Sequence, residues 1–271
     1  MRRTRSRRAT RPPSAVDAYS MEGPMADNQA LNARQQMVVA IRQLASEGYD
    51  DKLAGHVSMR DREDGTILVP RVGSLWEEFT VDDIVRIDAE GHIVEGEGNL
   101  NPTIVFHLEL HKARPDIVCA LHNHPPYGTM WACAGELPPL YDQTGANSGG
   151  TATVYAEYGG VVDTRRAAAE LAAAYGAADM AILVGHGTLI TASSVALALL
   201  RAQCFEHRSR KAWEVRALGL PGVPLPEHHA ARLAQAADVY ADLLLVAYAR
   251  RLRRTDPRAL LGEERVAASS V

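Results

Sequence analysis

The stretch Ala120-Leu-His-Asn-His-Pro-Pro-Tyr127 decides the fold, and it completes the apolar run Ile117-Val-Cys-Ala-Leu121. The run is typical of a short buried strand, and the two prolines end it. Side chains two residues apart on an extended segment point to the same side. We therefore expect His122 and His124 to reach one metal ion at the end of a strand.

A third ligand is available in a second apolar segment, Ala181-Ile-Leu-Val-Gly-His-Gly-Thr-Leu-Ile190, which we expect to form a strand broken by two glycines. Gly185 and Gly187 flank His186 and would let the backbone approach a bound ion closely. Three protein ligands with an open position are typical of catalytic zinc, and imidazole also suits iron, copper and nickel. The alternative is that each histidine only hydrogen-bonds within the core. The combined pattern favours a divalent metal, Zn²⁺ first and Fe²⁺ second.

The composition indicates a globular chain without a polyanionic partner. Its 271 residues are 46% hydrophobic, which is enough for a substantial core in one large domain. The net charge of -4 gives no reason to expect nucleic acid or an anionic membrane as a partner. The three scattered cysteines lie in apolar surroundings, which predicts reduced thiols and a cytoplasmic protein.

Three regions can be assigned along the chain. Residues 1–27 are basic and lack an apolar run, which predicts a disordered extension and excludes a signal peptide. Initiation at Met21 or Met25 is the simplest account of this extension, and a targeting or nucleic-acid arm is the alternative. Residues 28–254 should form the domain, and residues 255–271 should fray. No segment approaches the roughly 18 apolar residues of a membrane span.

Hydrophobic periodicity and turn signals predict the order of the elements. A helix comes first, and two hairpins after it should start an antiparallel sheet. A further helix leads into the strand that carries His122, and three more helices come after that strand. An apolar stripe on the second of these three should bury Trp213. The predicted segments are helix 28–48, hairpins 53–69 and 82–95, and helices 103–113, 165–174, 193–217 and 228–254.

Four motifs together resemble the class II aldolase and adducin family over about residues 30–250. The most specific is the Ala-Arg-Pro-Asp segment that leads into His-Asn-His. The resemblance implies a three-layer α/β/α fold with a mainly antiparallel central sheet. It also implies a divalent metal held by His122, His124 and His186, and a homotetramer. The motifs are Gly55-His-Val-Ser-Met-Arg60, Phe79-Thr-Val-Asp-Asp-Ile-Val85, the run from His107 to His124, and Gly185-His-Gly187.

The chain departs from the sugar-phosphate aldolases of that family at their Ser-Ser-Glu, where the serines bind phosphate and the glutamate is the acid/base. Here the sequence is Asn101-Pro-Thr103. Proline has no backbone donor, and threonine has no ionisable proton near neutral pH. The family's Gly-Asn pair becomes Gly55-His56, and its Thr/Ser-Gly turn becomes Pro70-Arg-Val-Gly73. These changes predict a substrate that is not a simple sugar phosphate.

Six further residues are candidates for the site. The arginine among them would hold a substrate carboxylate, the threonine would donate a hydrogen bond, and the tyrosine would donate a proton. The structural alternatives are a solvated turn for the arginine, a helix start for the threonine and a packing ring for the tyrosine. His107, on the predicted helix beside the metal strand, either supports the ligands from behind or is a satisfied core histidine. The substrate-binding candidates are His56, Arg71, Gly73 and Asn101, and the catalytic candidates are Thr103 and Tyr127.

The complete histidine set predicts a metal-dependent carbon–carbon lyase. Its cation would chelate a non-phosphorylated 2-oxo or 2-hydroxy acid and polarise the carbonyl for decarboxylation or retro-aldol cleavage. With Fe(II) the reaction could be oxidative, which resembles what family members in aminocoumarin antibiotic pathways do with a prenylated hydroxyphenylpyruvate. A sugar-phosphate aldolase or epimerase is the second interpretation, and a non-catalytic adducin-like assembly protein is the third.

Overall fold

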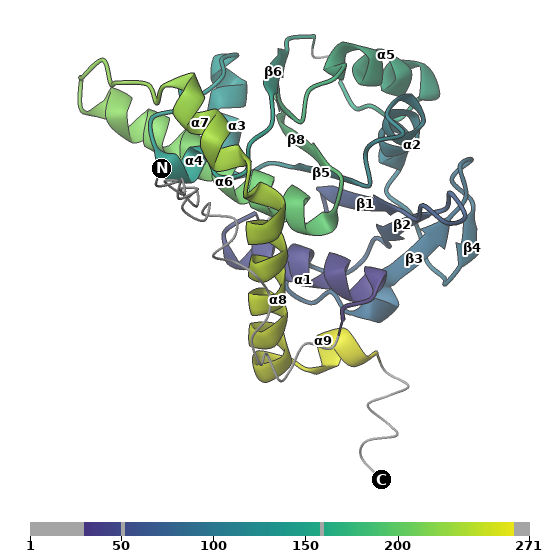
Figure 1. Cartoon of the computed structure of the whole chain (residues 1–271). Coiled ribbons are helices and arrows are strands. Elements are labelled where there is room, and N and C mark those ends of the chain that lie inside the picture. The colour runs from purple at the N-terminus through teal and green to yellow at the C-terminus, as the bar shows by residue number, and fades with distance from the viewer. Residues whose placement is uncertain (1–29, 50–51, 158–159, 263–271) are drawn as a thin grey trace, which may run out of the picture.

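The computed structural model describes residues 30–49, 52–157 and 160–262, so the predicted basic extension lies outside the described residues. Its centre is a sheet whose strands are β1 (His56–Arg60), β2 (Ile67–Pro70), β3 (Ile84–Ile87), β4 (Ile93–Glu95), β5 (Cys119–Asn123), β6 (Ala152–Tyr155), β7 (Met180–Leu183) and β8 (Gly187–Ala192). The strand order is β4-β3-β2-β1-β5-β8-β7-β6 (Figure 1). Only the β6–β7 pair of this sheet is parallel. The predicted α/β fold with a mainly antiparallel sheet is confirmed.

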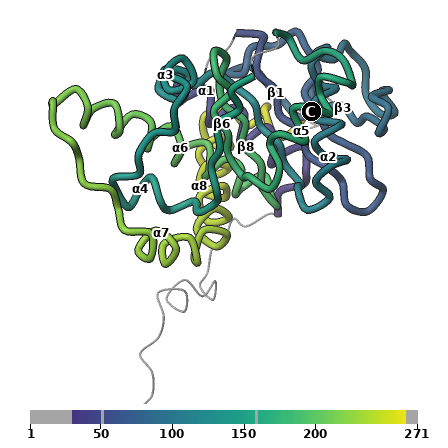
Figure 2. Tube along the Cα trace, turned by 90° about the horizontal axis from the view of Figure 1, so that it is seen from above, coloured from purple at the N-terminus to yellow at the C-terminus, as the bar shows by residue number. Residues whose placement is uncertain are grey.

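Helices cover both faces of this sheet. They are α1 (Ala33–Ser46), the short 3-10 helix η2 (Val81–Asp83), α2 (Ile104–Ala113), α3 (Pro126–Ala134), α4 (Gln143–Ala146), α5 (Arg165–Tyr175), α6 (Val195–Ala217), α7 (Glu227–Ala234), α8 (Ala237–Thr255) and α9 (Arg258–Leu261). One core cluster joins α2 and α5 to the sheet, and a larger one joins α1, α6 and α8 to its other face. Figure 2 shows the sheet between these two helix layers.

Strand β5 shows how the sequence produces the three layers. Leu121 belongs to the large cluster with α1 and α6, whereas Ala120 belongs to the cluster under α2 and α5. Successive strand side chains point to opposite faces, so a strand covered on both sides consists of one continuous apolar run. By this alternation His122 lies on the α2 side. His56 of β1 stands directly opposite it in the antiparallel register and shares that face.

Residues 181–190 form two antiparallel strands instead of the predicted one strand broken at Gly185 and Gly187. The segment folds back on itself as the hairpin β7–β8, with residues 184–186 between the two strands. Gly185 has φ of 70°, a left-handed conformation that glycine adopts without steric cost, and this explains where the chain turns. His186 therefore lies at a hairpin tip, not within a strand.

The C-terminal part also differs from the sequence prediction. The expected helix 228–254 is divided into α7 and α8, and neither glycine nor proline marks the division. Trp213 is 45% exposed, so its predicted burial is wrong. The predicted fraying after Asp256 is wrong up to residue 262, since Ala259 and Leu260 of α9 are buried. Across the described residues, no helix is both long and apolar enough to span a membrane.

Candidate active site

Three histidine side chains converge at the end of β5. His122 lies in that strand, His124 follows its last residue, and His186 comes from the β7–β8 hairpin tip. One ring nitrogen of each lies within 4.8 Å of those of the other two. Their ring centroids are 4.7 to 5.0 Å apart. The structure thus brings together the three residues that the sequence singled out as metal ligands.

A glycine allows this close approach between β8 and the end of β5. A Cβ atom added to Gly187 would lie 2.5 Å from Cδ2 of His124 and 2.6 Å from the carbonyl oxygen of Asn123. Those separations are far below van der Waals contact, so the two segments can meet only because residue 187 has no side chain. The second glycine of the Gly-His-Gly sequence is therefore required, because a side chain at residue 187 would collide with the end of β5.

The surroundings of His122 suit a metal ligand. Its Nδ1 donates a hydrogen bond to the carbonyl oxygen of Thr188 over 2.8 Å, which leaves Nε2 with a lone pair for a cation. Burial, followed by the charges of His56 and the other two ligands, holds the pKa of His122 well below its usual value. The ring is therefore neutral, as a ligand must be. Three neutral imidazoles fit Zn²⁺ or Fe²⁺ with a coordination position left for another group.

The three imidazoles open onto a hollow of about 250 Å³. Its polar end is formed by His56, Asn101 and Thr103, and aliphatic and aromatic side chains form the rest of its wall. None of the described residues that line it is a lysine, arginine, aspartate or glutamate. Most of the charge in this hollow would therefore come from a cation on the histidines.

Thr103, at the start of α2, is fixed from two sides. Its Oγ1 lies 2.7 Å from Oδ1 of Asn101 and also 2.7 Å from Nε2 of His56. A hydroxyl has one proton and two lone pairs. The hydroxyl donates to Asn101 and accepts from His56, so one lone pair of Oγ1 is left for a partner in the hollow. Thr103 can therefore accept a hydrogen bond there, whereas the sequence predicts that it donates one.

A buried chain of hydrogen bonds continues behind His56. Its Nδ1 lies 2.7 Å from Nε2 of His107, and Ser58 Oγ then joins His107 Nδ1 at 2.6 Å to His111 Nε2 at 2.8 Å. Burial is the main cause that lowers the pKa of all three rings, that of His111 to about 3. A neutral imidazole donates at one nitrogen and accepts at the other, so the bonds must run in one direction through linked rings. His107 thus supports Thr103 through His56.

Three predicted site residues do not line the hollow. Arg71 is paired with Asp83, with Nε and Nη2 at 3.0 and 2.9 Å from the same carboxylate oxygen. Gly73 is absent from the described lining as well. The ring of Tyr127 packs against Trp213 at a centroid distance of 5.8 Å, and it too is absent from that lining. The structure therefore does not support the carboxylate-binding and proton-donor roles predicted for Arg71 and Tyr127.

Sequence reasoning missed the apolar wall and one carboxylate. Leu171 and Leu183 line the hollow, but a single sequence does not distinguish a pocket-facing leucine from a core leucine. Glu206 of α6 accepts hydrogen bonds from the backbone N–H groups of Tyr127 and Gly128 at 2.8 and 2.7 Å. It caps the N-terminus of α3, where a negative charge is favourable. Burial nonetheless raises the pKa of Glu206.

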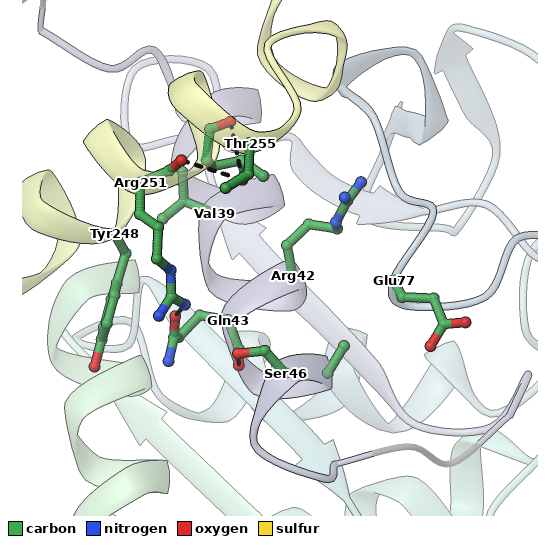
Figure 3. A pocket seen from close by; sticks show the side chains of 10 residues that line it. Val39, Arg42, Gln43, Ser46, Glu77, Tyr248, Arg251 and Thr255 are labelled. Carbon is green, nitrogen blue, oxygen red and sulfur yellow. Dashed lines mark hydrogen bonds between the residues drawn. The ribbon is translucent and has the colours of Figure 1, made fainter.

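A second hollow of about 290 Å³ lies between α1 and α8 (Figure 3). Its two arginines are held by protein groups. Arg42 pairs with Asp256 at 2.8 Å, and Arg251 donates to the side-chain oxygen of Gln43. No residue predicted for the site lines this hollow. The chemistry therefore belongs to the histidine cluster.

Known proteins share both the sequence and the fold. Residues 35–213 match the family model described as Class II Aldolase and Adducin N-terminal domain. The 5-methylthioribulose-1-phosphate/5-deoxyribulose-1-phosphate aldolase of Rhodospirillum rubrum is 29% identical over 214 residues, which cover 77% of this chain and 92% of that protein. The 5-deoxy-D-ribulose 1-phosphate aldolase of Bacillus thuringiensis serovar kurstaki is 26% identical over 211 residues, covering 76% and 96%.

The solved structure of L-fuculose 1-phosphate aldolase from Glaciozyma antarctica superposes with a TM-score of 0.72. Its sequence is 22% identical, and the match covers 84% of this chain and 90% of that one. At this identity the likeness supports the fold alone.

Proposed function

Since the chain belongs to the class II aldolase and adducin family, we propose that it is a divalent-metal-dependent carbon–carbon lyase for a non-phosphorylated 2-oxo or 2-hydroxy acid. One observation carries the proposal. The three-imidazole cluster opens onto a hollow whose described lining contains no cationic side chain. Such a hollow suits a substrate that is held by a metal ion and by uncharged groups.

The residues around the hollow have separate roles in this proposal. His122, His124 and His186 would hold the cation, which supplies Lewis-acid polarisation of the substrate carbonyl when bound. Thr103, held by His56, would accept a hydrogen bond from a substrate hydroxyl at its remaining lone pair. The apolar wall would exclude water from the reacting group.

The absence of cationic side chains from the described lining supports the choice of a substrate without phosphate. A phosphate carries close to two negative charges and is usually bound by arginine, lysine or backbone N–H groups. Here Pro102 has no N–H to offer, and Arg71 is engaged with Asp83 outside the hollow. No other lysine or arginine takes that place in the described lining.

A sugar-phosphate aldolase is the second candidate. The names of the relatives from Rhodospirillum rubrum and Bacillus thuringiensis both include 5-deoxyribulose 1-phosphate as a substrate, and this favours it. Oxidative cleavage with Fe²⁺ is a variant of the first proposal, and equal activity with and without dioxygen would eliminate it. An adducin-like assembly role is the remaining alternative, and a cleavage activity that depends on the metal would exclude it.

Metal analysis combined with a substrate panel tests the proposal. The purified full chain, loaded with Zn²⁺ or anaerobically with Fe²⁺, is assayed on 2-oxo acids, 2-hydroxy acids and ketose 1-phosphates. We expect cleavage of the acids, and loss of both metal and turnover in His122→Ala with an unchanged circular dichroism spectrum. The control His228→Ala, at an exposed position of α7, should keep both. A protein that binds no metal contradicts the proposal, and turnover of ketose phosphates alone establishes the second candidate.

We also propose a homo-oligomer, a tetramer by the family resemblance. Light scattering coupled to size-exclusion chromatography measures its mass, and a monomer at working concentration contradicts this.

A further inference from the structure

A smaller hollow of about 70 Å³ adjoins the candidate active site beyond His186. The two hollows share a wall of Val161, Val162, Leu171 and Leu183. We call the smaller hollow the side branch. It adds the side chains of Tyr155, Glu157, Ala167, Glu170 and Val184 to that wall.

The side branch is apolar inside and acidic at its edge. Leu171 and Leu183 are buried within the core cluster under α2 and α5. Glu157 and Glu170 are exposed, and Glu170 pairs with Arg166 at 2.8 Å. No lysine or arginine is found among the described residues of this wall. The side branch therefore favours an uncharged, apolar group and disfavours an anionic one.

We infer that the side branch receives an apolar substituent of the substrate, an alkyl or aryl group attached beyond the carbonyl that the metal binds. This inference rests on the proposed function and defines its substrate class as 2-oxo or 2-hydroxy acids with an apolar side chain. Each CH₂ group that moves from water into such a wall strengthens binding roughly fourfold. A second carboxylate in the same place would gain nothing and would face Glu157 and Glu170.

Binding of three simple acids to the zinc-loaded full chain tests this inference by calorimetry. Pyruvate is the reference, 4-methyl-2-oxopentanoate adds three carbons, and 2-oxoglutarate adds a distal carboxylate. We expect 4-methyl-2-oxopentanoate to bind on the order of 10- to 60-fold more tightly than pyruvate. We expect 2-oxoglutarate to bind no more tightly than pyruvate.

Two variants of α5 test whether the side branch causes the preference for 4-methyl-2-oxopentanoate. Ala167 faces the side branch, so Ala167→Phe should fill it and reduce the preference for 4-methyl-2-oxopentanoate to less than threefold. Ala169 is exposed on the same helix, and Ala169→Phe should keep the full preference. If Ala167→Phe loses its far-UV circular dichroism spectrum, Ala167→Leu provides a smaller obstruction for the same comparison.

The possible failures are distinguishable. If the zinc-loaded protein binds none of the three acids, the proposed function fails, and this inference fails with it. If pyruvate binds but the larger acid has no advantage, only the side-branch inference is overturned. The side-branch inference alone is also overturned if the folded Ala167 variants keep the preference for 4-methyl-2-oxopentanoate.

Discussion

Replacing His111 with glutamine should make the stability of the protein less sensitive to acid. The ring lies within α2, is 2% exposed and bonds through Nε2 to Ser58. Burial, and then the charge of Arg60, lowers its pKa from 6.5 to about 3 in the folded state. Glutamine is uncharged at all relevant pH values, and its amide can still donate to Ser58.

The sign and size of the effect follow from proton linkage. Between pH 3 and 6.5 the unfolded chain binds a proton at residue 111 that the folded chain does not, so the free energy of unfolding falls as the pH falls below 6.5. From pH 7 to pH 5 this one ring should cost about 2 kcal/mol of stability. That is a large fraction of the roughly 5–15 kcal/mol of a typical domain.

Urea unfolding of the wild type and His111→Gln at pH 7 and pH 5, followed by circular dichroism, measures the difference. The loss of unfolding free energy between the two pH values should be about 2 kcal/mol smaller in the variant. His228→Gln, at an exposed histidine of α7, should lose as much as the wild type. An equal acid loss in His111→Gln and in the wild type would refute the idea that this ring is buried neutral.

Three further predictions concern groups around the site. Gly187→Ala should weaken zinc binding roughly tenfold or more, measured by competition with a chelator, because the new Cβ would collide with His124; unchanged affinity would contradict the steric argument. Glu206→Ala should lower the unfolding free energy by about 1–3 kcal/mol in urea titrations, because two N–H groups of α3 lose their acceptor; an unchanged midpoint would show that the cap is dispensable. Ser58→Ala should lower the unfolding free energy by a similar amount, because His107 and His111 lose the hydroxyl that links them. Ser46→Ala is the control, since that hydroxyl donates to a carbonyl oxygen within its own helix α1.

The sequence predicts the framework and the ligands because both depend on local pattern. The apolar run before His122 implies a strand buried on two faces, and the hairpin turns lie between short alternating segments. That His122 and His124 point to the same side follows from the alternation of side chains along a strand. The break at Gly185 is predicted, but the reversal of the chain there is not, because a short apolar run fits one strand or two equally well.

Long-range contacts explain what the sequence does not predict. Arg71 lies two residues before Gly73, in the turn that the resemblance assigns to substrate binding, yet Asp83, 12 residues further along the chain, binds its guanidinium. Trp213 continues an apolar stripe but is 45% exposed, and its ring contacts Tyr127 of α3. Leu171 lines the hollow only because α5 packs beside α2. In each case a contact with another part of the chain determines where the side chain lies.

Two departures from the sugar-phosphate pattern are in contact with each other. The sequence resemblance aligns Thr103 with the glutamate of those aldolases and His56 with their asparagine. In this structure Nε2 of His56 and Oγ1 of Thr103 are 2.7 Å apart, and His56 is tied further back to His107. The histidine therefore uses one hydrogen-bonding position of the hydroxyl that replaces the carboxylate. The two changes form one hydrogen-bonded unit, which favours a rebuilt polar end of the hollow over a decayed phosphate site.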